Sequence, residues 1–211
     1  MTVHERLIAL EGIEGAGKTT VAERLAARLQ ALGHAVVRTR EPGGVPLAEK
    51  IRALLLDEAG EALDAGAEAL LFAAARRLHV REIIAPALAA GRFVLVDRYI
   101  DSSLVYQGLV GGAGVEAVRA INAFAVGDYF PAVTVLLDLD PDEALRRLAA
   151  DRRRAASRFD RRPPAFHRRV RDGYLRLARE APERFIVVDA GAPLEAVVEA
   201  AFSALRARYG L

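Results

Sequence analysis

The chain has 211 residues, of which 53% are hydrophobic and 27% are charged, so its composition predicts one packed domain and not a disordered chain. It contains no cysteine, which excludes disulfides, thiol catalysis and cysteine-based metal sites. The net charge is +2, with six arginines gathered between residues 151 and 163 of an otherwise acidic chain. Such a confined charge does not favour a nucleic-acid partner, which a broad basic face would bind.

No uncharged apolar stretch approaches the roughly 18 residues that a membrane-spanning helix needs. The apolar run near the N-terminus is too short for a secretory signal. We therefore expect a cytoplasmic protein without a membrane partner.

Short apolar runs alternate with longer helical patterns along the whole sequence. Strands are predicted at Leu7–Leu10, Val36–Thr39, Phe93–Val96, Thr134–Leu137 and Phe185–Val188. Helices are predicted at Thr19–Leu32, Leu47–Leu56, Ala62–Ala90, Val115–Val126, Asp142–Arg153, Pro164–Ala181 and Leu194–Arg208. Pro86 is expected to kink or end the long middle helix. Because the strands are almost wholly apolar, they are typical of buried parallel strands, and the alternation predicts a three-layer α/β fold with a five-stranded parallel sheet flanked by helices. Residues 1–211 are expected to form a single domain.

Ligands of such folds bind outside the carboxyl ends of the strands. The segments that follow the five predicted strands are EGIEGAGKTT, REPGG, DRY, DLDP and DAGAP. Several of them carry glycines, acids or arginines, which suit a phosphate or a metal ion. The sequence thus predicts its binding site at this edge of the sheet.

The segment from Gly12 to Thr19 fits the pattern G-x-x-x-x-G-K-[ST] of a phosphate-binding loop (P-loop) between a strand and a helix. Glycines let backbone N–H groups surround phosphate oxygens, and the start of the helix adds positive charge. Lys18 is suited to neutralise the β- and γ-phosphates, and the Thr19 hydroxyl to bind Mg²⁺. The residues predicted to bind ATP are Gly12, Gly15, Ala16, Gly17, Lys18, Thr19 and Thr20.

The third predicted strand ends in Asp97 and Arg98. A carboxylate in this position could hold Mg²⁺ directly or through water, and a guanidinium could bind a phosphate. Downstream residues up to Gln107 add hydroxyls and an amide within one or two helical turns.

Four separate motifs resemble the thymidylate kinase family, whose members phosphorylate dTMP to dTDP with ATP. They are the P-loop EGIEGAGKTT, TREPGG, LLFAAAR and LVDRYIDSSLVYQ, and together they extend the resemblance over nearly the whole chain. The resemblance implies a P-loop NTPase fold, ATP as co-substrate, Mg²⁺ as cofactor, a place in dTTP synthesis and a homodimer formed through helices on one side of the sheet.

The resemblance also implies a role for each matching residue on the dTMP side. Phe72 is expected to stack on the thymine, Arg76 to reach its O4 atom from the same helix face, and Gln107 to read the base edge. From its residue type alone, Phe72 would be assigned to the core. The set implied for dTMP is Glu14, Glu41, Pro42, Phe72, Arg76, Arg98, Ser102, Tyr106 and Gln107.

Four of these residues are expected to act on the sugar and phosphate. Tyr106 would crowd the 2′ position of the sugar, and Glu14 would accept a hydrogen bond from its 3′-hydroxyl. Arg98 would hold the monophosphate. Glu41 and Asp97 would work through Mg²⁺ and water. The residues expected to form the metal site itself are Thr19 and Asp97.

The arginine-rich segment resembles the mobile lid of the bacterial members, which carry their catalytic arginine there and not in the P-loop. Here Gly15 stands where other members have a basic residue in the P-loop. The lid is expected at approximately residues 149–163, with Arg158 as first choice for the catalytic charge and Arg153 and Arg154 as alternatives. The residues implied in catalysis are Lys18, Arg98, Arg158 and Arg153. The remaining arginines nearby, Arg146, Arg147, Arg168, Arg169 and Arg171, are expected to be solvated surface residues.

Two other interpretations stay open at this point. One is a kinase for another nucleoside monophosphate, since a single methyl group separates dTMP from dUMP. The other is a P-loop NTPase that binds nucleic acid through the arginine-rich segment, in which case binding would depend on salt and dTMP would not stimulate ATP turnover.

Overall fold

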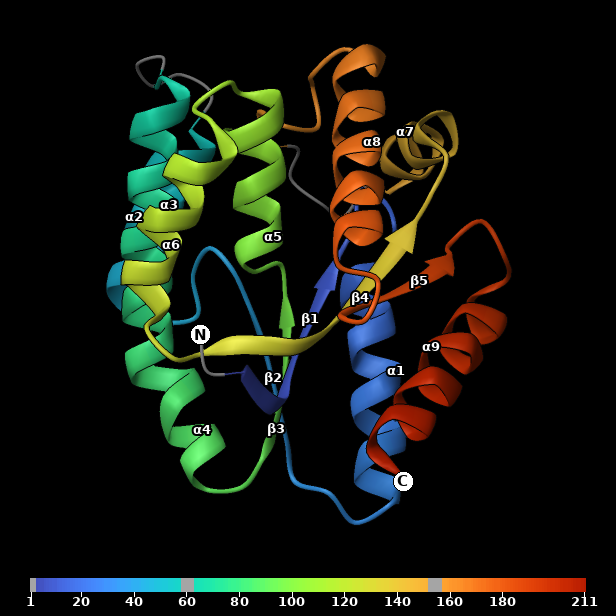
Figure 1. Cartoon of the computed structure of the whole chain (residues 1–211). Coiled ribbons are helices and arrows are strands. Elements are labelled where there is room, and N and C mark those ends of the chain that lie inside the picture. Colours follow the sequence, from blue (N-terminus) through green and yellow to red (C-terminus); the bar gives the residue numbers. More distant parts are fainter. Residues whose placement is uncertain (1–2, 58–62, 152–156) are drawn as a thin grey trace.

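The computed structural model describes residues 3–57, 63–151 and 157–211. Within these ranges, five parallel strands form one sheet in the order β2-β3-β1-β4-β5 (Figure 1). The strands are β1 (Val3–Glu11), β2 (Val36–Arg40), β3 (Phe93–Asp97), β4 (Phe130–Asp138) and β5 (Phe185–Asp189). The predicted α/β fold and its parallel sheet are therefore confirmed.

Helices cover both faces of the sheet. α1 and α9 pack against each other on one face, and α4, α5 and α8 lie on the other (Figure 1). The α-helices are α1 (Lys18–Ala31), α2 (Pro46–Leu56), α3 (Ala65–His79), α4 (Ala85–Ala89), α5 (Ile100–Ser103), α6 (Val115–Val126), α7 (Pro141–Ala150), α8 (Pro164–Glu180) and α9 (Leu194–Tyr209), and the π-helical segments are η1 (Val80–Ile84) and η2 (Leu104–Val110). None of the helices in the described ranges has the length and apolar character to cross a membrane.

The predicted long middle helix does not end at Pro86. It runs as α3, η1 and α4 without a break, because a π-helical turn precedes the proline. The Ala85 N–H donates to the Val80 carbonyl, five residues back. This wider turn changes the hydrogen-bond register just before the residue that lacks an N–H, so the helix continues.

Each strand is longer than predicted, and β1 and β4 exceed their predicted ranges most. β1 begins at Val3, although His4, Glu5 and Arg6 are polar, and it pairs with β4 on one side before the register shifts between His4 and Ile8. Backbone pairing therefore extends the strand beyond its apolar centre. The prediction was based on the apolar run alone, so the predicted strand ended where that run ends.

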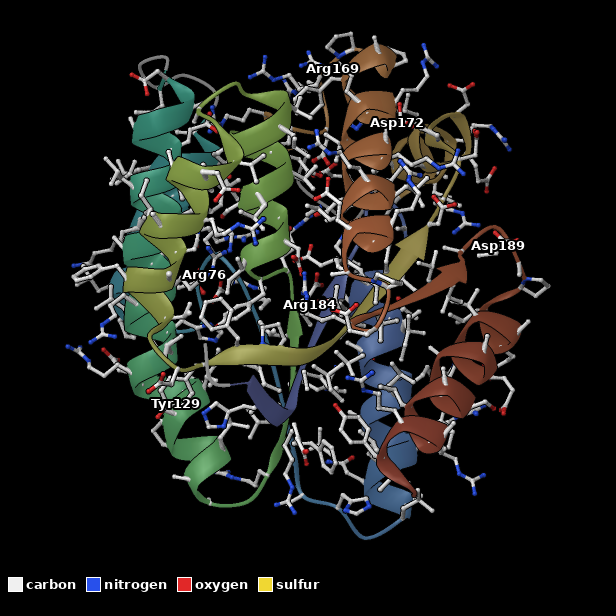
Figure 2. All side chains as sticks on the ribbon, viewed as in Figure 1. Arg76, Tyr129, Arg169, Asp172, Arg184 and Asp189 are labelled. Carbon is white, nitrogen blue, oxygen red and sulfur yellow. The ribbon has the colours of Figure 1, made fainter. Side chains whose placement is uncertain are left out.

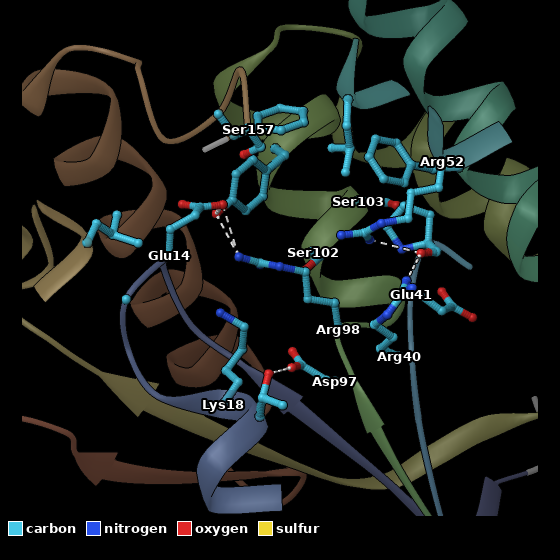
Figure 3. A pocket seen from close by; sticks show the side chains of 18 of the residues that line it. Glu14, Lys18, Arg40, Glu41, Arg52, Asp97, Arg98, Ser102, Ser103 and Ser157 are labelled. Atoms are coloured by element: carbon cyan, nitrogen blue, oxygen red, sulfur yellow. Dashed lines mark hydrogen bonds and ion pairs between the residues drawn. The ribbon is translucent and has the colours of Figure 1, made fainter. Parts of the chain in front are cut away.

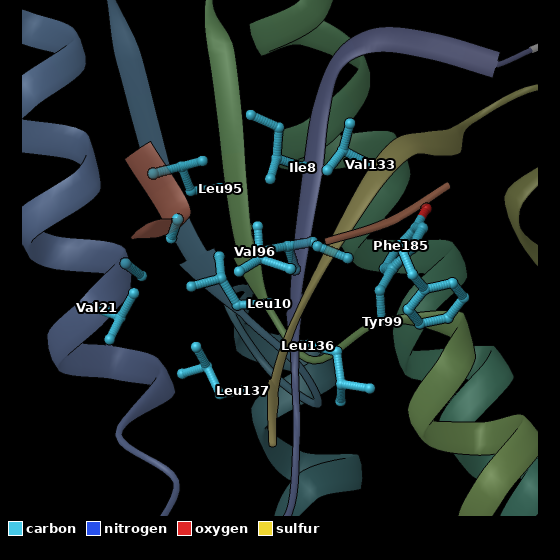
Figure 4. Close-up of a cluster of buried hydrophobic side chains, with 14 of the residues drawn as sticks. Ile8, Leu10, Val21, Leu95, Val96, Tyr99, Val133, Leu136, Leu137 and Phe185 are labelled. Carbon is cyan, nitrogen blue, oxygen red and sulfur yellow. The ribbon is translucent and has the colours of Figure 1, made fainter. Parts of the chain in front are cut away.

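The core surrounds the central strands. Leu7, Ile8, Ala9 and Leu10 of β1 are wholly buried, as expected of a parallel strand with helices on both faces. Figure 4 shows side chains from β1, β3 and β4 meeting Val21 of α1 and other apolar groups. This packing fixes the strand ends, from which the site is built.

A buried polar cluster ties α5 to the sheet. The Asp101 carboxylate is 1% exposed and accepts two hydrogen bonds from Arg184, each 2.7 Å long, and one of 2.9 Å from the Thr134 hydroxyl. Arg184 is labelled near the middle of the molecule in Figure 2. Since Asp101 begins the segment that carries Ser102, this cluster holds one wall of the site.

Replacement of Asp101 by alanine is expected to lower the free energy of unfolding by about 3 kcal/mol, because it leaves the Arg184 guanidinium and the Thr134 hydroxyl without their acceptor. Urea denaturation followed by circular dichroism measures the change. Glu195→Ala is the matched control: this carboxylate lies 3.9 Å from Arg24 in an exposed pair, and its loss should cost below about 0.5 kcal/mol. Similar losses in both variants would contradict the structural role of the cluster.

Candidate functional site

A cavity of about 410 Å³ opens at the carboxyl ends of β1, β2 and β3 (Figure 3). All residues implied for dTMP line it: Glu14, Glu41, Pro42, Phe72, Arg76, Arg98, Ser102, Tyr106 and Gln107. From the P-loop it is lined by Gly15, Gly17, Lys18, Thr19 and Thr20, and the metal candidate Asp97 also contributes. Gly12 and Ala16 are buried in the loop itself and do not line the cavity. Segments far apart in the sequence thus form one site.

The P-loop needs glycine where its backbone passes close to neighbours. Gly12 has φ +141°, and a Cβ atom there would lie 2.5 Å from the Leu137 carbonyl oxygen. Gly15 has φ +78°, and its Cβ would lie 2.7 Å from the Ala144 carbonyl oxygen. The loop therefore fits between β4 and α7 only without side chains at these two positions. It leads directly into α1, whose N-terminal N–H groups suit an anion.

Lys18 and Thr19 stand at the first turn of α1. The Lys18 ammonium donates to the carbonyl oxygens of Gly12 and Ile13, at 3.0 and 2.8 Å. Burial, together with repulsion from Arg98, lowers the pKa of Lys18 to about 8. The Thr19 hydroxyl donates to the Asp97 carboxylate at 2.6 Å. The two predicted metal-site residues are therefore direct neighbours.

Arg98 lies at the centre of the cavity. Its guanidinium donates to Ser102 Oγ, the Tyr174 hydroxyl and Glu14 Oε1, at 3.1, 3.2 and 3.0 Å. Burial opposes its charge, but the neighbouring Tyr106 and Glu14 outweigh this and raise the pKa of Arg98 well above its usual value. The side chain is thus held as a fixed cation in position for a phosphate.

Glu14 is the partner of Arg98 within the P-loop. Burial alone would raise the pKa of Glu14, but Arg98 and the nearby His167, followed by Lys18 and the Tyr106 hydroxyl, bring it well below its usual range. Tyr106 donates its hydroxyl to Oε1 at 2.7 Å. The other oxygen, Oε2, is buried without a hydrogen-bond partner among the described residues, with His167 Nδ1 3.6 Å away. An unpartnered acceptor beside the cavity suits a ligand hydroxyl.

Glu11 anchors the turn that follows Arg98. It is wholly buried at the end of β1, and burial, followed by the nearby Asp101, raises its pKa. It accepts from the backbone N–H groups of Tyr99 and Ser102, and from the hydroxyls of Ser102 and Tyr174 at 2.7 and 2.8 Å. Arg98 precedes this anchored turn and has φ +68°, a backbone conformation that a non-glycine residue rarely adopts. Glu11 therefore helps to hold Arg98 in its strained position.

Arg76 is almost wholly buried between α3, α5 and α6 (Figure 2). It donates to Glu41 Oε2 at 2.6 Å, to Ser103 Oγ at 3.1 Å and to the Tyr99 carbonyl at 2.9 Å, and it also bonds Asn122. These contacts fix the guanidinium in one orientation at the cavity wall. The sequence did not indicate them.

Glu41 was expected to act through metal and water, but in this structure both of its oxygens contact protein groups. Oε2 accepts from Arg76, and Oε1 lies 2.8 Å from His79 Nδ1. The Thr39 hydroxyl lies 2.6 Å from the other ring nitrogen of His79. With these contacts, Glu41 positions Arg76.

Arg40 and Arg52 line the cavity and were missed by the sequence analysis. Both donate to the Pro42 carbonyl, at 2.8 and 3.0 Å, so they surround the segment that follows β2. Arg40 lies within the TREPGG motif, and its place at a strand end was the available signal. Arg52 lies within α2, where an arginine on a polar helix face carries no such signal.

Arg158 contacts α2 and α3, away from the P-loop. Its Nε donates to the Leu55 carbonyl at 2.6 Å, and its Nη2 lies 2.7 Å from Glu68 Oε1. The neighbouring residues Ser157 and Phe159 line the cavity, whereas Arg158 does not. A catalytic role for Arg158 would require its guanidinium to leave these partners. The alternatives Arg153 and Arg154 lie outside the described residues.

The arginines that were expected to be solvated divide into three groups. Arg146, Arg168 and Arg169 are bound to surface acids or a carbonyl. Arg171 makes two bonds to Asp138 at the end of β4. Arg147 lines the cavity while it donates to Glu143 at 2.9 Å, so it belongs to the site more closely than expected.

The parallel sheet, the P-loop and the cation-lined cavity define a P-loop nucleotide-binding protein. Residues 10–201 match the family model of thymidylate kinase. The chain is 50% identical to a thymidylate kinase of Geobacillus thermodenitrificans over 189 residues, 90% of this chain and 84% of that protein. It is 47% identical to one of Enterococcus faecalis over 203 residues, 96% of each chain. The chain therefore belongs to the thymidylate kinase family.

A structural comparison agrees with this assignment. The crystal structure of thymidylate kinase from Ehrlichia chaffeensis matches with a TM-score of 0.76 and 32% sequence identity, and the match covers 94% of this chain and 97% of that chain.

ATP is expected to bind more weakly as pH rises above about 8. Bound phosphates favour protonated Lys18, so its pKa in the complex lies above the free value of about 8. The contribution of Lys18 to affinity is therefore constant well below pH 8 and falls between the two pKa values, and binding takes up a proton in that interval. Isothermal titration calorimetry in two buffers of different ionisation enthalpy measures this uptake. Lys18→Arg, which stays charged, should remove the pH step, and a step that persists in this variant would assign it to another group.

Proposed function

We propose that this chain transfers the γ-phosphoryl group of ATP to dTMP, which yields ADP and dTDP and supplies dTTP synthesis. Family membership supports the reaction. The observation that carries the proposal for this site is that the P-loop and every residue implied for dTMP line one cavity. Two nucleotides bound there would meet with their phosphates between Lys18 and Arg98.

The ATP side of the reaction is assigned to the P-loop. Its backbone and the start of α1 would hold the phosphates, with Lys18 exchanging its carbonyl contacts for the β- and γ-phosphate oxygens. The ATP-binding set would be Gly12, Gly15, Ala16, Gly17, Lys18, Thr19 and Thr20.

Mg²⁺ is proposed to be held by Thr19 and Asp97. A hydroxyl and a carboxylate 2.6 Å apart are the hard oxygen donors that Mg²⁺ prefers. Among the described residues no group of three or more acids and histidines could hold a metal by itself. This suits an ion that is completed by water and substrate phosphates, since Mg²⁺ rarely binds in an all-protein cage. When bound, it would neutralise developing charge on the transferred group.

The dTMP side is assigned to the residues around Arg98. This cation, with Arg40 and Arg52 nearby, would bind the monophosphate, and Ser102 and Pro42 would shape its surroundings. Glu14 would accept a bond from the 3′-hydroxyl with its unpartnered oxygen.

The base and the 2′ side of the sugar are assigned to the part of the cavity wall that α3 and η2 form. Tyr106, whose hydroxyl is fixed on Glu14, would exclude a 2′-hydroxyl. Phe72 would stack on thymine, and Arg76, held by Glu41, would donate to O4. Gln107 would contact the base edge. Arg76 and Gln107 would thus read the ring by polarity, and Phe72 would read it by stacking.

A lid arginine is proposed to complete the transition-state charge. Arg158 and Arg153 are the candidates, with Lys18 and Arg98 as the fixed cations of the reaction. Phosphoryl transfer develops negative charge that such a group stabilises, and closure would keep water from the γ-phosphate.

We further propose a cytoplasmic homodimer that binds no nucleic acid and no membrane. Leu70 of α3 and Phe124 of α6 are 59% and 87% exposed, and these two helices pack together on one side of the molecule. Exposed apolar side chains on adjacent helices favour a protein partner. The described surface arginines mostly have acidic or carbonyl partners, which does not favour a nucleic-acid surface.

The proposed reaction is tested with a coupled assay of ADP release and a panel of nucleoside monophosphates. dTMP should give the highest kcat/KM, with dUMP next, because they differ by one methyl group. ATP turnover that no monophosphate stimulates, together with salt-dependent binding to DNA or RNA, would favour the nucleic-acid interpretation instead.

Phe72→Ala is expected to weaken dTMP binding about tenfold or more, because it removes the aromatic surface proposed to stack on thymine. ATP affinity should change little, since Phe72 is on α3 and is not part of the P-loop. Titration with each nucleotide separately measures the two affinities. Equal dTMP affinity in the variant and the wild type would show that Phe72 packs in the core and does not bind thymine.

A further inference from the structure

Glu68 is a buried carboxylate beside the cavity that the resemblance did not assign. It lies in the first turn of α3 and is 7% exposed. Its Oε2 accepts a hydrogen bond of 3.0 Å from Gln107 Nε2, and Arg158 Nη2 lies 2.7 Å from its Oε1. It therefore connects the residue proposed to read the base with an arginine of the lid segment.

The chemistry of this contact decides which way the Gln107 amide points. A glutamine side chain has a donor NH₂ group and an acceptor oxygen that look alike in shape. An ion-paired carboxylate has no proton to donate and can only accept. Gln107 must therefore direct its NH₂ group to Glu68, and its carbonyl oxygen is the group that remains for the cavity that it lines.

Arg158 keeps Glu68 suited to this task. A buried carboxylate without a cation is costly. The guanidinium at Oε1 supplies the opposite charge and leaves Oε2 for Gln107. Two contacts on the two oxygens of one carboxylate thus fix the orientation of the amide.

We propose that Glu68 determines base specificity by holding the Gln107 carbonyl oxygen toward the ring N3 position of the nucleotide. This rests on the proposed function. Thymine and uracil carry an N3–H donor, which the oxygen accepts, whereas cytosine carries a bare N3 acceptor, which the oxygen repels. Glu68 is a positioning residue in this scheme, since it acts through Gln107 and does not touch the substrate.

The test compares dTMP with dCMP in Glu68→Gln, a variant of nearly the same shape. A glutamine at this position can donate or accept, so Gln107 can turn and offer either group to the base. The ratio of kcat/KM for dTMP to that for dCMP should fall about tenfold, the value of one oriented hydrogen bond. The change should lie mainly in the KM of the monophosphates, and the KM of ATP should stay the same.

Glu68→Met provides a second way to release the amide, because an apolar side chain of similar size removes the acceptor altogether. It should lower the same ratio. The melting temperature of each variant establishes that it is folded before its kinetics are compared.

Two further variants separate this effect from others. Arg158→Gln removes the guanidinium that fixes the Glu68 carboxylate, so its own dTMP-to-dCMP ratio should also fall. This comparison is independent of any loss in its kcat, because the ratio cancels a loss common to both substrates. Glu82→Gln, at an exposed pair with Arg81, is the matched surface control and should change neither parameter.

The outcomes are distinct. A folded Glu68→Gln or Glu68→Met enzyme with the wild-type ratio overturns the inference and leaves the proposed function standing. A wild-type protein that does not phosphorylate dTMP overturns the proposed function, and the inference with it.

Discussion

The close approach of Lys18 and Arg98 in one cavity is the interaction on which the site depends. Two cations are needed where two phosphate chains meet, yet each disfavours the charge of the other before any phosphate is present. Burial, together with this repulsion, lowers the pKa of Lys18 to about 8. Glu14 and Glu11 offset it: Glu14 contacts Arg98 directly, and Glu11 anchors the turn that carries Arg98. The carboxylates of the P-loop region therefore stabilise the cations while the phosphates are absent.

Most of the site is held rigid by buried hydrogen bonds between elements and not by local structure. Arg76 bonds Glu41, Ser103 and the Tyr99 carbonyl, which come from the segment after β2 and from both ends of the turn into α5. Such a guanidinium loses little freedom when a ligand arrives, so less of the binding energy is used to order it. The strained backbone of Arg98 is maintained in the same way, by anchors on both sides of the residue. A fixed geometry of donors also costs little reorganisation during the reaction.

The sequence predicted the sheet and the edge at which the cavity opens, because apolar runs and the rule of strand ends depend only on local pattern. It could not predict π-helical turns such as η1, since the hydrogen-bond register of a helix depends on its packing. Glu68 and His167 were missed for another reason. Their partners, Gln107 and Glu14, are 39 and 153 residues distant in the chain, and no spacing rule joins them. Phe72 reads as core from its residue type, and only the family motif singled it out.

The arginine-rich segment illustrates why charge alone is a poor guide to function. By their number alone, six arginines within thirteen residues would fit an extended polyanion, although their confinement to one segment does not favour it. In the described part of the segment, however, Arg158 is held by Glu68 and the Leu55 carbonyl and packs on Phe159. Its positive charge is thus directed inward, to a single carboxylate at the rim of the nucleotide cavity. Moving a paired cation to another anion costs little free energy, because one ion pair replaces another and the cation is not left buried without a partner. This suits a site in which the anion to be met, a phosphoryl group in transfer, exists only briefly.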